Sequence, residues 1–129
     1  MSKTLTIVGI GPGEQGFVTP EVSAAIAPAT DAVGYTPYIE RLPARPDLVC
    51  HPSENRVELD RARHALDLAA AGGDVVVVSS GDPSVFAMSA AVFEAMETPS
   101  TAWADVEITV MPGITAMLAA SAAIGAPLG

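Results

Sequence analysis

The sequence predicts an α/β fold with an open, mainly parallel, twisted sheet and helices on both of its faces. Short apolar runs rich in β-branched residues alternate with segments whose apolar residues recur at helical spacing, which is the pattern of parallel βα units. One run, 75–78, consists of four valines and suits a central strand that is covered on both faces. Glycine and proline mark the turns between these segments.

The first third of the chain is predicted to contain two strands and one helix. Residues 5–10 form a strand that ends at a glycine- and proline-rich turn. Thr19 and Pro20 then have the order of an N-cap and a first helical residue, and predict a helix through Ala27. A weaker strand follows at 31–35.

The next segments are a loop and a helix. Four prolines over 36–52 predict a loop with at most a brief strand at 48–49. Asn55 and Glu58 resemble a capping box. The helix that follows would bury Leu59, Ala62, Leu66 and Ala69 and would end at Gly72-Gly73.

After the valine strand, the pattern gives one more strand between two helices. A helix is predicted to bury the stripe of Val85, Met88, Val92 and Met96. A polar loop at 99–104 leads to a strand over 106–110, and an alanine-rich helix spans 114–124.

Composition limits the class of protein. The 129 residues are about one domain, and 50% hydrophobic against 16% charged residues excludes a disordered tail. The net charge of −9, without any cluster of lysine and arginine, argues against nucleic acid as a partner. A lone cysteine, no signal-peptide layout and no apolar run near the roughly 20 residues of a membrane helix predict a soluble cytoplasmic protein.

Three βα turns have the residues of a ligand site. They span 9–13, 80–83 and 112–116, and each follows a predicted strand. Ligands of open α/β sheets bind beyond the carboxyl ends of the strands. Glycines there allow close backbone approach, and free N–H groups at helix starts favour polar acceptors. The alternative is that these glycines serve the turns alone.

Residues 11–16 formally satisfy G-x-G-x-x-G, the dinucleotide-binding pattern. Three features weigh against that interpretation. Pro12 removes an N–H that a pyrophosphate would use, Pro20 delays the helix, and the acid about 20 residues on, Asp31, precedes the second strand instead of following it.

The three turns, with their surroundings, resemble the tetrapyrrole (corrin/porphyrin) methylase family. The motifs are G-I-G-P-G at 9–13, S-S-G-D-P-S-V-F-A at 79–87 and P-G-I-T-A-M-L-A-A at 112–120. The resemblance covers essentially the whole chain. Within the family, segments 33–39 and 55–72 are most similar to the branch that methylates precorrin-3B at C17 in cobalamin biosynthesis.

The resemblance implies a two-domain, homodimeric enzyme that transfers a methyl group from S-adenosylmethionine to a tetrapyrrole carbon, leaving S-adenosylhomocysteine. For this branch it implies ring contraction to precorrin-4. Residues 1–129 would be the N-terminal α/β domain, and the chain, which stops in turn-forming residues, would lack the C-terminal domain and be inactive alone. The alternatives are a methylase of another precorrin or uroporphyrinogen intermediate, or a non-catalytic α/β interaction module.

The same resemblance assigns residues to the site. The expected cofactor contacts are Pro12, Ser80, Gly81, Asp82, Val85, Thr115 and Ala116. Gly11, Pro12, Gly13 and Tyr38 would face the tetrapyrrole, and Asp82 is the candidate catalytic acid. Methyl transfer depends mainly on alignment, so we expect no metal. The acidic chain suits a cationic donor but repels a polycarboxylate substrate. The basic residues that could offset this repulsion are Lys3, Arg41, Arg45, Arg56, Arg61 and Arg63.

Simpler structural roles compete for several of these residues. Asp82 would cap the helix after Pro83, Thr115 would cap the last helix, and Pro12 would stiffen its turn. Tyr35 would pack against the sheet.

The remaining polar and sulfur-containing residues are expected to have structural or solvent-exposed positions. His64 would pair with Asp60 at the surface, and His51 beside Cys50 lacks further metal ligands. Three arginines, Arg56, Arg61 and Arg63, would lie on a solvated face. The core would contain Met88, Met96, Met111 and Met117.

Overall fold

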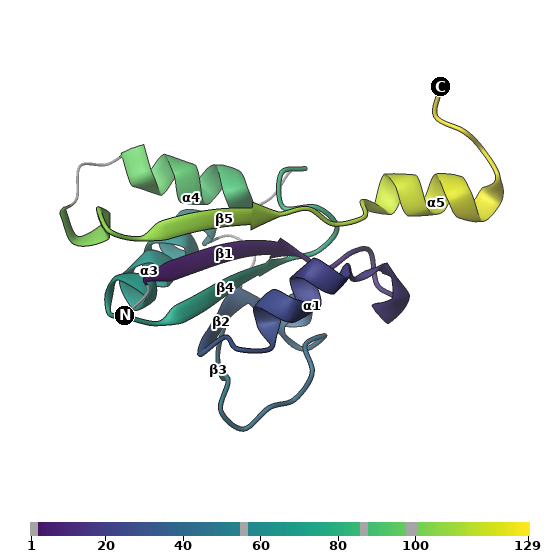
Figure 1. Cartoon of the computed structure of the whole chain (residues 1–129). Coiled ribbons are helices and arrows are strands. Elements are labelled where there is room, and N and C mark those ends of the chain that lie inside the picture. The colour runs from purple at the N-terminus through teal and green to yellow at the C-terminus, as the bar shows by residue number, and fades with distance from the viewer. Residues whose placement is uncertain (1–2, 55–56, 86–87, 98–100) are drawn as a thin grey trace.

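The computed structural model describes residues 3–54, 57–85, 88–97 and 101–129. A five-stranded sheet forms its centre, and every pairing is parallel. The strand order is β3-β2-β4-β1-β5 (Figure 1). The strands are β1 (Thr4–Gly9), β2 (Asp31–Tyr35), β3 (Val49–Ser53), β4 (Asp74–Ser79) and β5 (Glu107–Met111). The predicted open parallel α/β sheet is confirmed.

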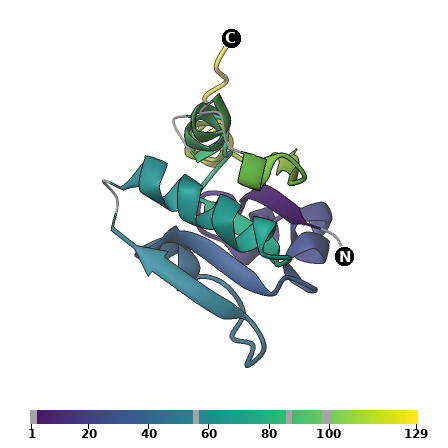
Figure 2. The ribbon, with the colours of Figure 1, turned by 90° about the vertical axis from the view of Figure 1, so that its left-hand side faces the viewer.

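Helices cover both faces of this sheet. The helices are α1 (Pro20–Ile26), α2 (Thr36–Ile39), α3 (Glu58–Ala70), α4 (Met88–Glu97) and α5 (Ala116–Ile124). The first two pack on one face, and α3 and α4 lie together on the other (Figures 1 and 2). Two short 3₁₀ turns, Gln15–Phe17 and Thr101–Trp103, complete the described structure.

The valine strand β4 contributes to both cores. Val75 and Val77 pack under α3 and α4, whereas Val76 and Val78 pack under α1 and α2. All four are fully buried, because successive side chains of a strand point to opposite faces. Its neighbour β1 lies between β4 and β5, so the ends of these three strands lie side by side.

Local signals placed most elements correctly. The Thr19 hydroxyl accepts a hydrogen bond from Val22 N at 3.2 Å and starts α1 as predicted. The strand expected at 48–49 is longer, because 49–53 pairs in register with β2. The short helix α2, at Thr36–Ile39, was predicted as loop. Pro37 fits inside it because a proline in the first turn costs no hydrogen bond.

The expected capping residue Asn55, with Arg56, lies outside the described residues. α3 begins at Glu58 without a side-chain cap from its N-cap residue, Val57.

The methionine prediction is partly wrong. Met88 is buried and Met96 packs at the edge of the core, but Met117 is 60% exposed. It lies on α5, which projects from the end of β5 away from the sheet (Figure 1) and has no buried residue. None of the described helices is long and apolar enough to cross a membrane.

Candidate functional site

The three predicted turns meet at the carboxyl edge of the sheet. The first follows β1, the second β4 and the third β5, and these strands are neighbours. Gly11 and Gly81 form an isolated antiparallel bridge between the first two turns. Gly81 N donates to Gly11 O at 2.9 Å, and Gly11 N donates to Gly81 O at 3.2 Å. The backbones of two turns are therefore joined directly.

Glycine is required where the turns touch. A Cβ atom on Gly113 would lie 2.3 Å from Gly81 O, and one on Gly9 would lie 2.4 Å from the same oxygen. Both distances are impossible for real side chains, so the third turn and the end of β1 converge on one carbonyl. Gly81 itself has a φ of 61°, which favours glycine. Its missing side chain faces Thr115, whose Cα would lie 3.7 Å from an added Cβ.

Asp82 joins the second turn to the third. Its Oδ1 atom accepts a hydrogen bond from Gly113 N at 3.0 Å, and its Oδ2 atom accepts one from Ser84 N at 2.9 Å. The predicted helix cap is wrong as stated, because residues 83–85 form a turn and not the start of a helix. The carboxylate instead closes this turn, with a local bond typical of aspartate. Asp82 thus binds backbone amides in the turns that follow β4 and β5.

Other predicted cofactor residues line the same edge. Thr115 is the N-cap of α5, and its hydroxyl accepts from Leu118 N at 3.2 Å, as predicted. Val85 precedes α4 and is 44% exposed, so its expected place in the buried stripe is wrong. Ala116 is exposed beside Thr115, and Ser80 is half-buried next to Gly81. The edge therefore offers backbone groups, small side chains and the exposed apolar side chain of Val85.

Residues named for the substrate divide into two groups. Gly11, Pro12 and Gly13 lie in the first turn, with Gly11 buried and Gly13 exposed. Tyr38 lies apart, on α2, where its ring meets the ring of Tyr35 edge-on at 5.1 Å. Both tyrosines are half-buried, as packing predicted for Tyr35. Tyr38 also packs against the core cluster that includes Ile10 of the first turn.

Arg41 belongs to the site, although sequence reasoning treated it only as a positive charge. Its Nη2 atom donates to the carbonyl oxygens of Ile10 at 2.9 Å and Gly11 at 3.0 Å, and its Nη1 atom donates to Ser80 Oγ at 3.3 Å. The side chain thus spans the first and second turns. No local pattern marks it, because the loop after α2 reaches the turns only through the tertiary fold.

A cavity of about 400 Å³ lies beside the first turn. Arg41 and Arg45 supply its cationic groups, and Arg45 donates to the carbonyls of Ala27 and Ala29. Its lining is mainly apolar: Ile10, Gly13, Gln15, Val18, Ser23, Ile26, Ala27, Leu42 and Pro43 complete it. A volume of this size is typical of small-molecule sites.

A second polar cluster lies between β3 and α3, away from the three turns. Arg61 is only 4% exposed, so its predicted place on a solvated face is wrong. Its Nε atom donates to Ser53 Oγ at 2.8 Å, and its guanidinium also reaches Glu54 O and Met88 Sδ. Burial lowers the pKa of this guanidinium, against the opposing effects of Glu58 and Tyr38. Arg63 keeps its exposed position as predicted.

The histidines belong to this cluster as well. His51 Nε2 lies 2.8 Å from Asp31 Oδ2, and the ring of His64 meets that of His51 edge-on at 4.9 Å. The predicted pairing of His64 with Asp60 is wrong, since Asp60 instead pairs with Arg63 at 3.5 Å. Burial would raise the pKa of Asp31, but hydrogen bonds from His51 and Thr30 outweigh it and hold the pKa below its usual range.

Metal ligands do not gather in the described ranges. Over residues 3–54, 57–85, 88–97 and 101–129, no group of three or more histidine, cysteine, aspartate or glutamate side chains could hold an ion. The free thiol of Cys50 is exposed.

Curated relatives resemble the chain in sequence over its whole length. The whole chain is 54% identical to a precorrin-3B C(17)-methyltransferase of Sinorhizobium sp, of which it covers 51%. It is 44% identical to the cobalamin biosynthesis protein CobIJ of Mycobacterium tuberculosis, of which it covers 25%. The chain therefore spans about half or less of the length of these relatives.

Solved structures share the fold. The crystal structure of the methyltransferase CobJ superposes with a TM-score of 0.92 at 62% identity, over 97% of this chain and 52% of that one. The precorrin-6Y methylase CbiE of Archaeoglobus fulgidus has the same fold, with a TM-score of 0.71 at 23% identity, over 99% of this chain and 61% of that one. The sequence profile of the Tetrapyrrole (Corrin/Porphyrin) Methylases matches residues 4–129, and the chain belongs to this family.

Proposed function

We propose that this chain is the N-terminal α/β domain, residues 1–129, of an S-adenosylmethionine-dependent C-methyltransferase of cobalamin biosynthesis. Its substrate would be precorrin-3B, methylated at C17 with ring contraction to precorrin-4. The observation that carries the proposal is the junction of the three turns at the carboxyl edge, held by Asp82 and by the Gly11–Gly81 bridge. The 54% identical relative named for this reaction supports the substrate.

The residues at the junction suit this cofactor. Gly81 leaves room for close approach, Val85 offers an exposed apolar side chain, and Thr115 lies next to Gly81 with the exposed Ala116 beside it. Ser80 and Pro12 would complete the contacts. The cofactor supplies a methyl group on a positively charged sulfur, open to in-line displacement. The net charge of −9 favours such a cation.

The contribution of the chain would be alignment. Correct placement of two reactants can remove several kcal/mol of a barrier, and a rigid backbone junction provides such placement. Both oxygens of Asp82 already accept backbone hydrogen bonds, so we assign it a positioning role in preference to proton transfer. Gly11, Pro12 and Gly13 would border the tetrapyrrole, and Tyr38 would reach it only from α2.

The intact enzyme would need more than this chain. About half of the length of the Sinorhizobium relative lies outside it, and we propose that a C-terminal domain supplies the remaining cofactor contacts. A homodimer in the cytoplasm would be the working form. Residues 1–129 alone should then fail to methylate precorrin-3B.

Calorimetry on the full-length protein tests the proposal. S-adenosylhomocysteine should bind, and incubation with S-adenosylmethionine and precorrin-3B should give the methylated, ring-contracted product by mass spectrometry. No binding would reject the cofactor assignment, whereas binding without turnover of precorrin-3B would point to another precorrin or uroporphyrinogen substrate.

A second candidate is a non-catalytic α/β interaction module. The exposed apolar side chains of α5, among them Met117, Leu118 and Ile124, favour a protein partner in either case. A full-length protein that binds its partner but no S-adenosylhomocysteine would select this alternative.

A further inference from the structure

We propose that Arg41 is a positioning residue that fixes the first turn against the second and thereby sets the affinity for S-adenosylmethionine. This inference rests on the proposed function, and it concerns a residue that contributes no predicted contact to the cofactor. Its basis is the set of three hydrogen bonds from one guanidinium to Ile10, Gly11 and Ser80.

The geometry requires arginine. Nη2 reaches two successive carbonyl oxygens at 2.9 and 3.0 Å, while Nη1 reaches a hydroxyl on the neighbouring strand's turn at 3.3 Å. A planar guanidinium presents several donors in a fixed fork. A lysine ammonium at the same place could approach one carbonyl but could not span both turns.

The fold delivers this side chain from a distant part of the chain. Ile39, buried at the end of α2, packs against Gly34 of β2. Arg41 N then donates to Tyr38 O at 3.1 Å in a tight turn. The short helix therefore places Arg41 next to the carboxyl ends of β1 and β4.

The contacted atoms belong to the junction itself. Gly11 O accepts from Arg41 and also from Gly81 N at 2.9 Å. Without the guanidinium, the bridge would keep its own two backbone hydrogen bonds and the long 3.5 Å bond from Ser80 Oγ to Gly11 O, and Ile10 O would lose its cationic donor. The spacing of Gly11 and Gly81 would loosen, and with it the surface that the cofactor would meet.

The test uses full-length protein with Arg41→Lys and Arg41→Met. Calorimetry should show the Kd for S-adenosylhomocysteine rising about tenfold, the size expected for lost charge-assisted hydrogen bonds. Hydrogen exchange followed by NMR should show faster exchange at the Gly11 and Gly81 amides. Arg63→Met, on an exposed arginine of α3, is the matched control and should change neither quantity.

A merely structural role is separated by a second control. Val22→Ala removes volume from the buried core under α1 and should lower Tm without changing Kd. Equal Kd in wild type and both Arg41 variants would overturn the inference. It would also be overturned if Val22→Ala, with a Tm similar to that of the Arg41 variants, raised the Kd as much as they do. If wild type binds nothing, the proposed function fails, and the Gly11 and Gly81 exchange rates alone then decide whether Arg41 orders the junction.

Discussion

Asp82 Oδ1 and Gly113 N are joined by a hydrogen bond of 3.0 Å across the ends of two strands that are not neighbours in the sheet. β1 lies between β4 and β5, so this bond bridges over the end of β1, where Gly9 leaves no side chain. A single carboxylate thus ties the second and third turns together.

Asp82→Ala should lower the free energy of unfolding by about 1–3 kcal/mol, because Gly113 N and Ser84 N lose their acceptor. Asp82→Asn retains one acceptor oxygen and should cost less. Urea denaturation monitored by circular dichroism measures both. A loss from Asp82→Ala no greater than from Glu94→Ala, at an exposed position on α4, would contradict a bridging role.

Gly113→Ala should disrupt the junction, since the added Cβ would lie 2.3 Å from Gly81 O. Backbone must shift to relieve the overlap, so we expect several kcal/mol of destabilisation and loss of S-adenosylhomocysteine binding. Gly16→Ala, where an added Cβ meets nothing within 4 Å, is the control. Thermal unfolding and calorimetry should separate the two variants clearly.

Arg61→Ala should destabilise the protein by about 1–3 kcal/mol, because Ser53 Oγ and Glu54 O would lose the hydrogen bonds that the buried guanidinium donates. Arg63→Ala should change stability by less than about 1 kcal/mol, since its ion pair with Asp60 is exposed. Chemical denaturation compares them. Equal losses of unfolding free energy in Arg61→Ala and Arg63→Ala would show that the buried contacts of Arg61 do not stabilise the protein.

Asp31 should make stability depend on acid pH. Its pKa is lowered in the folded state, so its contribution is complete above the unfolded pKa of about 3.9 and is lost as the pH falls through the folded value. The free energy of unfolding of Asp31→Asn should therefore fall less steeply than that of wild type below about pH 4. Urea titrations at stepped pH measure this slope, and Asp60→Asn, at a 77% exposed side chain, should retain the wild-type slope.

The sequence specified much of the fold because its signals were local. Four successive valines predicted a strand buried on both faces, and Thr19 with Pro20 predicted where α1 begins; both are confirmed. The order of the turns along the chain also predicted that they would meet, since parallel strands bring their carboxyl ends to one edge.

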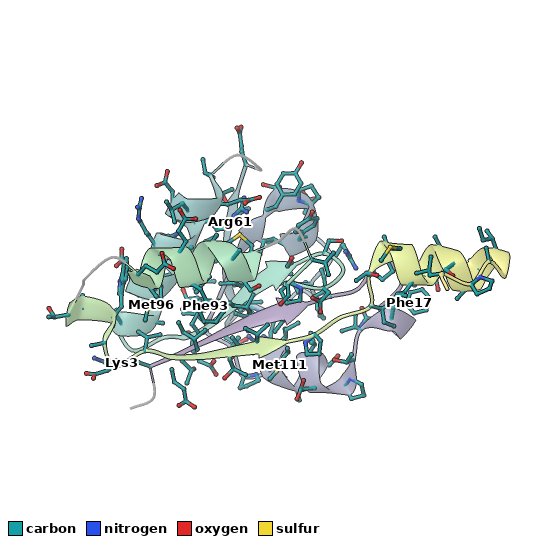
Figure 3. All side chains as sticks on the ribbon, turned by 90° about the horizontal axis from the view of Figure 1, so that it is seen from above. Lys3, Phe17, Arg61, Phe93, Met96 and Met111 are labelled. Carbon is teal, nitrogen blue, oxygen red and sulfur yellow. The ribbon has the colours of Figure 1, made fainter. Side chains whose placement is uncertain are left out.

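The errors arose where tertiary contacts decide. Charge pattern on a helix could not show that Arg61 turns toward Ser53 on β3. The loop sequence after α2 could not show that Arg41 contacts both the turn after β1 and the turn after β4. Met117 lies in an apolar helix typical of a core, but α5 projects away from the sheet and leaves its side chain exposed. Figure 3 shows α5 extending beyond the end of the sheet, with side chains projecting from the helix.

The position of β1 in the sheet also constrains how the chain folds. Thr4 pairs with Asp74 on one side and with Glu107 on the other, so the first strand finds both partners only after most of the chain has been made. Such long-range parallel pairing has a large loop-closure cost and slows folding. Until β4 and β5 arrive, β1 is an apolar strand with two open edges, and this interval is when the protein is most open to aggregation.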